Sequence, residues 1–119
     1  KYCFFNNSFI LAQKIVDVFN KIYHKNILIT DKDKVIAGPD EYTGKTLSTD
    51  VVDIINKRND SYKKTNIIDN NKISNTYIYP IISNSDALGS VVLIDDNIDD
   101  YSKGIIKLIS AILVKNIEE

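Results

Sequence analysis

Two consecutive strand-like segments in the C-terminal half of the chain constrain its fold more than any other feature. Thr76–Ser83 is dominated by aromatic and β-branched residues, and Leu88–Ile94 is a nearly continuous apolar run. Only the short polar turn Asn84–Asp86 separates them, so they are expected to pair as an antiparallel hairpin. An apolar run of this length is typical of a central strand that is covered on both faces. Pro80 has no N–H to donate, so it must lie at a sheet edge or a bulge.

The rest of the chain supplies shorter helical and strand-like segments around this hairpin. Apolar residues at helical spacing indicate helices, and β-branched runs bounded by polar turns indicate the remaining strands. We expect a helix from Ser8 to about Ile22, strands at Ile27–Thr30 and Val35–Ala37, a short helix between Ser48 and Asn59, strands at Ser61–Asp69, Thr76–Ser83 and Leu88–Ile94, and a last helix from about Asp99. This order predicts an α+β domain, with an antiparallel sheet of about five strands and the first and last helices packed together on one face.

Length and charge narrow the class of protein. The 119 residues are 44% hydrophobic, which suits a single domain over residues 1–119 with its own core. Fifteen basic residues against 16 acidic ones give a formal net charge of −1, so the chain offers little attraction to nucleic-acid phosphates. No apolar run approaches the ~18 residues of a membrane helix, and Cys3 is the only cysteine. We therefore expect a soluble cytoplasmic protein without an internal disulfide.

Residues that carry chemistry are sparse. His24 is the only histidine, and neither a cysteine cluster nor a glycine-flanked nucleophile accompanies it. The string GPDEYTGKT at Gly38–Thr46 has five residues between its glycines, one more than a phosphate-binding loop, and Pro39 lacks a backbone N–H. The sequence thus predicts no enzyme activity, no metal site and no cofactor.

The last helix has two apolar rows, whereas packing on a sheet requires only one. We expect one row to cover the sheet and the other to meet a second copy of the chain, which predicts a homo-oligomer held together through the first and last helices. The row expected on the sheet contains Ile105, Leu108, Ile109 and Ile112, and the row expected at the oligomer interface contains Ile106, Leu113 and Ile117.

Four segments of the chain resemble a known protein family. YIYPIISNSDALGSVVLIDD at Tyr77–Asp96 is similar to the signature of a GAF domain, where a strand ending in Pro-Ile leads through a polar turn to a glycine and a buried strand. Lys1 and Tyr2 with the helix after them, ILITDKDKVIA at Ile27–Ala37 and GKTLS at Gly44–Ser48 complete the pattern. In this order they resemble the C-terminal GAF-like half of the stage V sporulation protein T family, over nearly the whole chain.

The resemblance implies the regulatory domain of a transcription factor of spore-forming bacteria, able to enclose a small molecule and to assemble through its C-terminal domains. The family pairs this half with an upstream AbrB-like DNA-binding domain, so DNA would be contacted only through that module. A first residue Lys1 and the absence of Met fit a piece of a longer protein. Two alternatives stay open: a PAS-like small-molecule sensor, and a purely structural dimerisation or tetramerisation domain without a ligand.

The resemblance also implies where a ligand would bind. In a GAF-like fold the connection after the second strand covers the sheet face opposite the terminal helices, and here that connection, Gly38–Val51, is long and bracketed by glycines. Tyr77 and Tyr79 alternate along one strand, so both hydroxyls point to one face, where they would orient a small molecule. In the alternative, Leu47 and Ile68 fill the space and close the cavity. The predicted ligand contacts are Ile36, Leu47, Ile68, Tyr77 and Tyr79.

Overall fold

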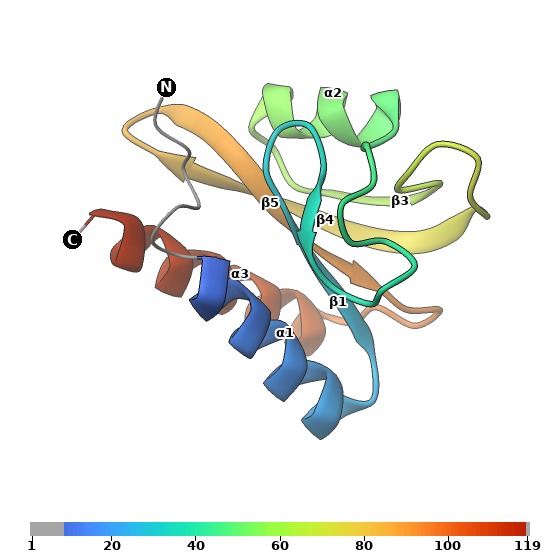
Figure 1. Ribbon diagram of the computed structural model, residues 1–119, viewed down its shortest axis with the longest axis horizontal. Coiled ribbons are helices and arrows are strands. Elements are labelled where there is room, and N and C mark those ends of the chain that lie inside the picture. Colours follow the sequence, from blue (N-terminus) through green and yellow to red (C-terminus); the bar gives the residue numbers. More distant parts are fainter. Residues whose placement is uncertain (1–8, 119) are drawn as a thin grey trace.

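The computed structural model describes residues 9–118 as one five-stranded sheet between two layers of helices (Figure 1). In chain order the elements are α1 (Phe9–Tyr23), β1 (Asn26–Thr30), β2 (Val35–Ala37), α2 (Thr49–Lys57), β3 (Ser61–Thr65), β4 (Ser74–Ser83), β5 (Asp86–Ile94) and α3 (Asp100–Glu118). All neighbouring strands are antiparallel, in the order β2-β1-β5-β4-β3. The predicted α+β architecture and its five-stranded antiparallel sheet are confirmed.

β5 is the central strand, as its apolar run predicts. It pairs with β1 over Asn26–Thr30 on one side and with β4 over Thr76–Ser83 on the other. Successive side chains of a strand point to opposite faces, so Val91 and Leu93 pack under α1 and α3 while Val92 packs under α2. The run is continuous because both faces of this strand are covered.

α1 and α3 lie side by side on one face of the sheet, and α2 with the loop before it covers the other face (Figure 1). This confirms the predicted placement of the two terminal helices. Helical spacing in the sequence predicts one apolar row in α1, formed by Leu11, Ile15, Val18, Phe19 and Ile22. The buried side chains are instead Ala12, Val16 and Phe19, whereas Val18 and Ile22 are exposed. The row that packs on the sheet is therefore rotated by about one residue from the row that the sequence indicates.

Pro80 lies where the β3–β4 ladder ends. β3 pairs with β4 only over Ser74–Ile78, while β4 continues to Ser83. The outer side of β4 beyond Ile78 has no partner strand among the described residues, so the missing N–H of Pro80 costs no ladder hydrogen bond there. Pro80 therefore has a free strand side, as expected, because β3 is shorter than β4 and not because β4 is an edge strand.

The strand predicted over Ser61–Asp69 is shorter than expected, because β3 ends at Thr65. Ile67 and Ile68 follow in a loop and are buried on the α2 side, where Ile68 forms an isolated bridge with Leu47. Their apolar side chains anchor this loop to the core instead of extending the sheet.

Some expectations concern residues outside the described part of the chain. The proposed N-cap Ser8, the opening Lys1 and Tyr2, and Cys3 are among them. Within residues 9–118, no helix is long and apolar enough to cross a membrane.

Gly89 marks a close approach of β5 to the end of β1. A Cβ atom at this position would lie 1.9 Å from the carbonyl oxygen of Thr30, so Gly89→Ala must push two backbones apart. We expect it to lower the free energy of unfolding by about 2 kcal/mol or more, measured by urea denaturation.

Gly104 in α3 provides the matched control. Nothing lies within 4 Å of a Cβ atom built there, and alanine favours a helix over glycine by about 0.5–1 kcal/mol. Gly104→Ala is therefore expected to stabilise the protein. Equal stability of the two variants would contradict this account of β5 packing.

Candidate functional site

The five residues predicted to line one ligand pocket lie on opposite faces of the sheet. Leu47 and Ile68 pack in the core under α2, whereas Ile36, Tyr77 and Tyr79 pack in the core under α1 and α3. The two tyrosines do share a face, as their alternation predicts, but it is the face of the terminal helices. The prediction of a single pocket lined by all five is wrong, because alternation along a strand does not reveal which face is which.

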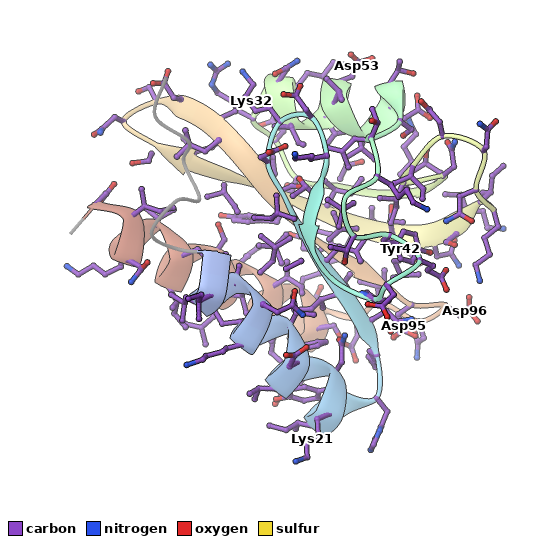
Figure 2. The ribbon with its side chains drawn as sticks, viewed as in Figure 1. Lys21, Lys32, Tyr42, Asp53, Asp95 and Asp96 are labelled. Atoms are coloured by element: carbon purple, nitrogen blue, oxygen red, sulfur yellow. The ribbon has the colours of Figure 1, made fainter. Side chains whose placement is uncertain are left out.

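Side chains fill the space beneath Gly38–Val51. Tyr42, a loop residue on the α2 side (Figure 2), is 3% exposed and Leu47 is equally buried. The apolar cluster they join also contains Leu28, Val35, Val51, Ile54, Ile55, Ile67, Ile68, Ile78, Ala87 and Val92. This arrangement matches the alternative in which Leu47 and Ile68 close the cavity. A surface hollow of about 340 Å³ lies between loops 41–46 and 68–71.

The segment expected to cover a ligand, Gly38–Val51, is tied to the β1–β2 hairpin by backbone hydrogen bonds. Gly44 N–H donates to the carbonyl of Val35 at 2.8 Å, and Leu47 N–H donates to Asp33 at 2.8 Å. Ser48 caps α2 and also donates its hydroxyl to the carbonyl of Asn66 at 2.7 Å. These bonds hold Gly44–Ser48 against the rest of the domain.

Two of the three predicted interface residues of α3 are core residues. Ile106 and Leu113 are 0% exposed and Ile117 is half-buried, whereas Leu108 is 60% and Ile112 45% exposed. The interface prediction for Ile106 and Leu113 is therefore wrong. Both rows of α3 repeat at the same helical spacing, so periodicity alone does not determine which row faces the sheet.

The exposed row of α3 lies beside exposed apolar residues of α1. We call this surface the helix face. A groove of about 310 Å³ runs between the two helices and is almost wholly apolar, and a second hollow continues it toward Leu11 and Ile112. At the other end the hydroxyls of Tyr23 and Tyr101 are hydrogen-bonded, which raises the pKa of Tyr23. The large exposed side chains of the helix face are Val18, Ile22, Tyr23, Tyr101, Leu108 and Ile112.

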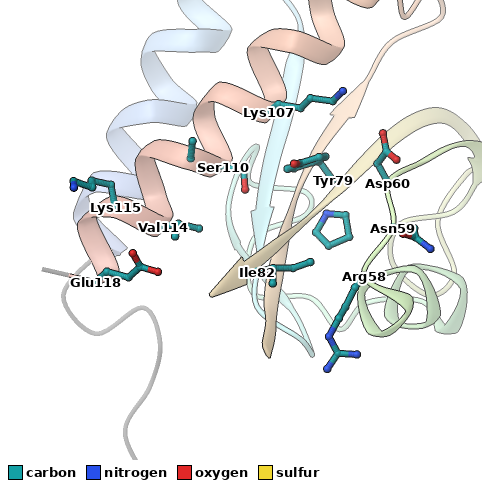
Figure 3. A pocket seen from close by; sticks show the side chains of 12 residues that line it. Arg58, Asn59, Asp60, Tyr79, Ile82, Lys107, Ser110, Val114, Lys115 and Glu118 are labelled. Atoms are coloured by element: carbon teal, nitrogen blue, oxygen red, sulfur yellow. The ribbon is translucent and has the colours of Figure 1, made fainter. Parts of the chain in front are cut away.

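A second surface feature, the α3–β4 hollow, lies between the C-terminal half of α3 and the uncovered part of β4 (Figure 3). Its volume is about 520 Å³, and residues 58–60 close its far side. Two local features create the space: β3 stops pairing at Ile78, and α3 presents the small side chains of Ser110 and Ala111 toward β4. Of the five predicted ligand contacts, only Tyr79 lines this hollow.

Both carboxylates of the α3–β4 hollow accept hydrogen bonds from neighbouring hydroxyls. Asp60 accepts from Tyr77 Oη at 2.5 Å, and Glu118 accepts from Ser83 Oγ at 2.8 Å. Burial and the Asp60 carboxylate hold the pKa of Tyr77 well above its usual value. The Lys103 ammonium lies over the Tyr77 ring, 5.6 Å from its centroid.

A sequence comparison decides the family. The model of the family described as "Stage V sporulation protein T C-terminal, transcription factor" matches residues 9–118. The chain belongs to this family. Its members are thus transcription-factor domains, and the resemblance drawn from the sequence is confirmed. No curated protein matches the chain.

Solved structures show the fold of this family member to be GAF-like. The type II free methionine-R-sulfoxide reductase from Thermoplasma acidophilum matches with a TM-score of 0.66 and 8% identity, over 91% of this chain and 90% of that one. The cofactor-binding GAF domain of the nutrient sensor CodY from Clostridium difficile matches with a TM-score of 0.60 and 20% identity, over 92% and 83%. At these identities the likeness concerns the fold alone.

Sequence reasoning missed the charged residues of the α3–β4 hollow. Arg58, Lys107 and Lys115 are far apart in sequence and belong to no motif. One feature of the sequence does indicate this region. A proline within a predicted strand requires that one side of the strand be unpaired, and the unpaired side of β4 at Pro80 lines the hollow.

Tyr77→Phe tests the hydrogen bond to Asp60. We expect it to lower the free energy of unfolding by about 1 kcal/mol at neutral pH, measured by urea denaturation. A raised pKa means that the folded state holds the phenol proton more tightly than the unfolded chain, so the wild type loses stability as pH rises above about 10. Tyr77→Phe is expected to lose less over that range.

Tyr62→Phe, at an exposed position of β3, is the control and is expected to keep wild-type stability at neutral pH. The same loss of stability with rising pH in the wild type and in Tyr77→Phe would contradict the assigned role of Tyr77.

Proposed function

We propose that this chain is the assembly and small-molecule-sensing domain of a sporulation-type transcription regulator, and that copies associate through the helix face. The observation that carries the proposal is the exposure of six large apolar side chains on the adjacent outer sides of α1 and α3. Monomeric proteins rarely leave such a surface open, and an apolar patch of this kind is typical of a protein interface. The partner that fits it is a second copy of the chain.

The groove between α1 and α3 supports a specific mode of association. Its walls come from Ile15 and Val18 on α1 and from Ile105 on α3, with Lys14 as its one charged lining residue. Ridges of one helix pair fit the grooves of another, so two copies that meet here form a four-helix layer between two sheets. Each Ile or Leu moved from water into this layer contributes about 1–2 kcal/mol.

Small-molecule sensing is the second part of the proposed function. It is favoured by the α3–β4 hollow, since the space beneath Gly38–Val51 is filled. The likeness to a GAF domain described as cofactor-binding in a nutrient sensor supports the same role. DNA contact is assigned to an upstream module, because a formal net charge of −1 gives this chain little attraction to phosphates.

We propose that the domain is not an enzyme. The only histidine, His24, is exposed at the end of α1, and residues 9–118 contain no cluster of three or more His, Cys, Asp or Glu able to hold a metal. The reductase with the same fold is 8% identical to this chain. At that identity the likeness gives no reason to assign its catalytic role to this chain.

Ile22→Lys and Leu108→Lys test assembly through the helix face. Both side chains are exposed, so the lysines leave the monomer folded, but burying a charge in the interface is costly. We expect a wild-type oligomer and monomeric variants, measured by light scattering with circular dichroism as a check on folding.

Ile73→Lys is the matched control, because Ile73 is also a highly exposed isoleucine, 70% against 61% for Ile22, but lies in the loop before β4. It is expected to keep the oligomer. A wild type that stays monomeric at about millimolar concentration, or an Ile73→Lys variant that dissociates as Ile22→Lys does, would refute the proposed interface.

A further inference from the structure

Among residues 9–118, the cationic groups of the α3–β4 hollow have no anionic partner. No carboxylate within residues 9–118 forms an ion pair with Lys107 or Lys115. Arg58 donates to two backbone carbonyls, Ser85 O at 2.9 Å from Nε and Asn56 O at 3.1 Å from Nη1. These bonds orient the guanidinium without neutralising its charge, and its remaining N–H groups are still able to donate.

The carboxylates of the same hollow are already engaged. Asp60 and Glu118 accept hydroxyl protons from Tyr77 and Ser83, as described above. The three cations therefore have more unused hydrogen-bonding capacity than the two anions. A ligand entering the hollow meets free donors with positive charge, which favours an acidic group on that ligand.

The wall of the hollow between these charges combines apolar side chains with an aromatic ring and a hydroxyl. Figure 3 shows Val114 and Ser110 on α3 across from Tyr79 and Ile82 on β4, with Arg58 at the Ile82 end. The Tyr79 ring is held beside the Tyr77 ring, with centroids 6.4 Å apart. An aromatic wall of this kind offers a stacking surface to a planar molecule, and about 520 Å³ is within the range of small-molecule sites.

We propose that the α3–β4 hollow binds a small planar molecule that carries an acidic group, either a carboxylate or a phosphate. Its planar body stacks on Tyr79 between β4 and Val114, and its acidic group is held by Lys107, Lys115 or Arg58 at the rim. The proposal deepens the sensing part of the proposed function, on which it rests, and is independent of assembly through the helix face.

An extended peptide fits this hollow less well than a small molecule. The uncovered side of β4 offers a strand edge, and peptides often bind by adding a strand to such an edge. Pro80 lies in this stretch and has no N–H, which is a feature that blocks strand addition. A ligand in this hollow is therefore bound by side chains rather than by backbone hydrogen bonds.

The test uses 2-naphthoate and 2-naphthyl phosphate as probes and the uncharged 2-naphthamide as a control with the same planar body. Binding to the 119-residue chain is followed by amide chemical-shift mapping. Both acidic probes are expected to shift amides at residues 58–60, 79–82 and 107–115, and to bind at least fivefold more tightly than 2-naphthamide. The ratio of the two acidic probes shows whether carboxylate or phosphate is preferred.

Variants locate the charge that is recognised. Lys107→Gln and Lys115→Gln together are expected to weaken naphthoate binding at least fivefold, because both ammonium groups are removed while the exposed positions keep the fold intact. Lys14→Gln, at the groove of the helix face, and Lys32→Gln, in the β1–β2 turn, are expected to leave binding unchanged.

Four outcomes would overturn the proposal: no shifts at about 5 mM probe, shifts confined to the groove between α1 and α3, shifts confined to loops 41–46 and 68–71, or equal binding of 2-naphthamide. None of them bears on assembly, which is measured separately by light scattering. Shifts confined to loops 41–46 and 68–71 would refute binding in the α3–β4 hollow, but they would support the sensing function with a ligand on the α2 side.

Discussion

Burial of β5 on both faces is the constraint on which the rest of the structure depends. Val91 and Leu93 require a layer on one side and Val92 requires a layer on the other, so the helices must divide between two faces. A sheet with only one covered face would leave part of this strand in water. The connection before α2 fills the second face for the same reason, and this is why it forms part of the core rather than a lid over a cavity.

The division into two layers also explains where an open hollow can exist. The α2 side is filled by the long loop and by Ile67 and Ile68, which leave the sheet to pack inward. On the other side α3 extends past the point where β3 stops, and small side chains at Ser110 and Ala111 leave space beside β4. The shortened β3 and Pro80 therefore produce both the end of the ladder and the α3–β4 hollow.

The fold was largely predictable because hairpins and helices depend on local patterns. The turn at Asn84 and Ser85, the run that became β5 and the order of elements all follow from residues close in sequence. The assignment of faces was not predictable. The two rows of α3 have equal spacing, so the sequence does not show that Ile106 is buried on the sheet and Leu108 is exposed. In the same way, alternation does not show that Tyr79 lies on the α3 side of the sheet rather than under the loop.

α3 is the element that both proposed functions share. It presents Lys107 and Lys115 to the α3–β4 hollow and Leu108 and Ile112 to the helix face, while Ile106 holds it on the sheet. A ligand changes assembly only if it binds associated and separate chains with different affinities, and a tenfold difference corresponds to about 1.4 kcal/mol. By linkage, assembly must then change ligand affinity by the same factor. A shift of α3 on the sheet would supply such a difference, because it alters both surfaces at once.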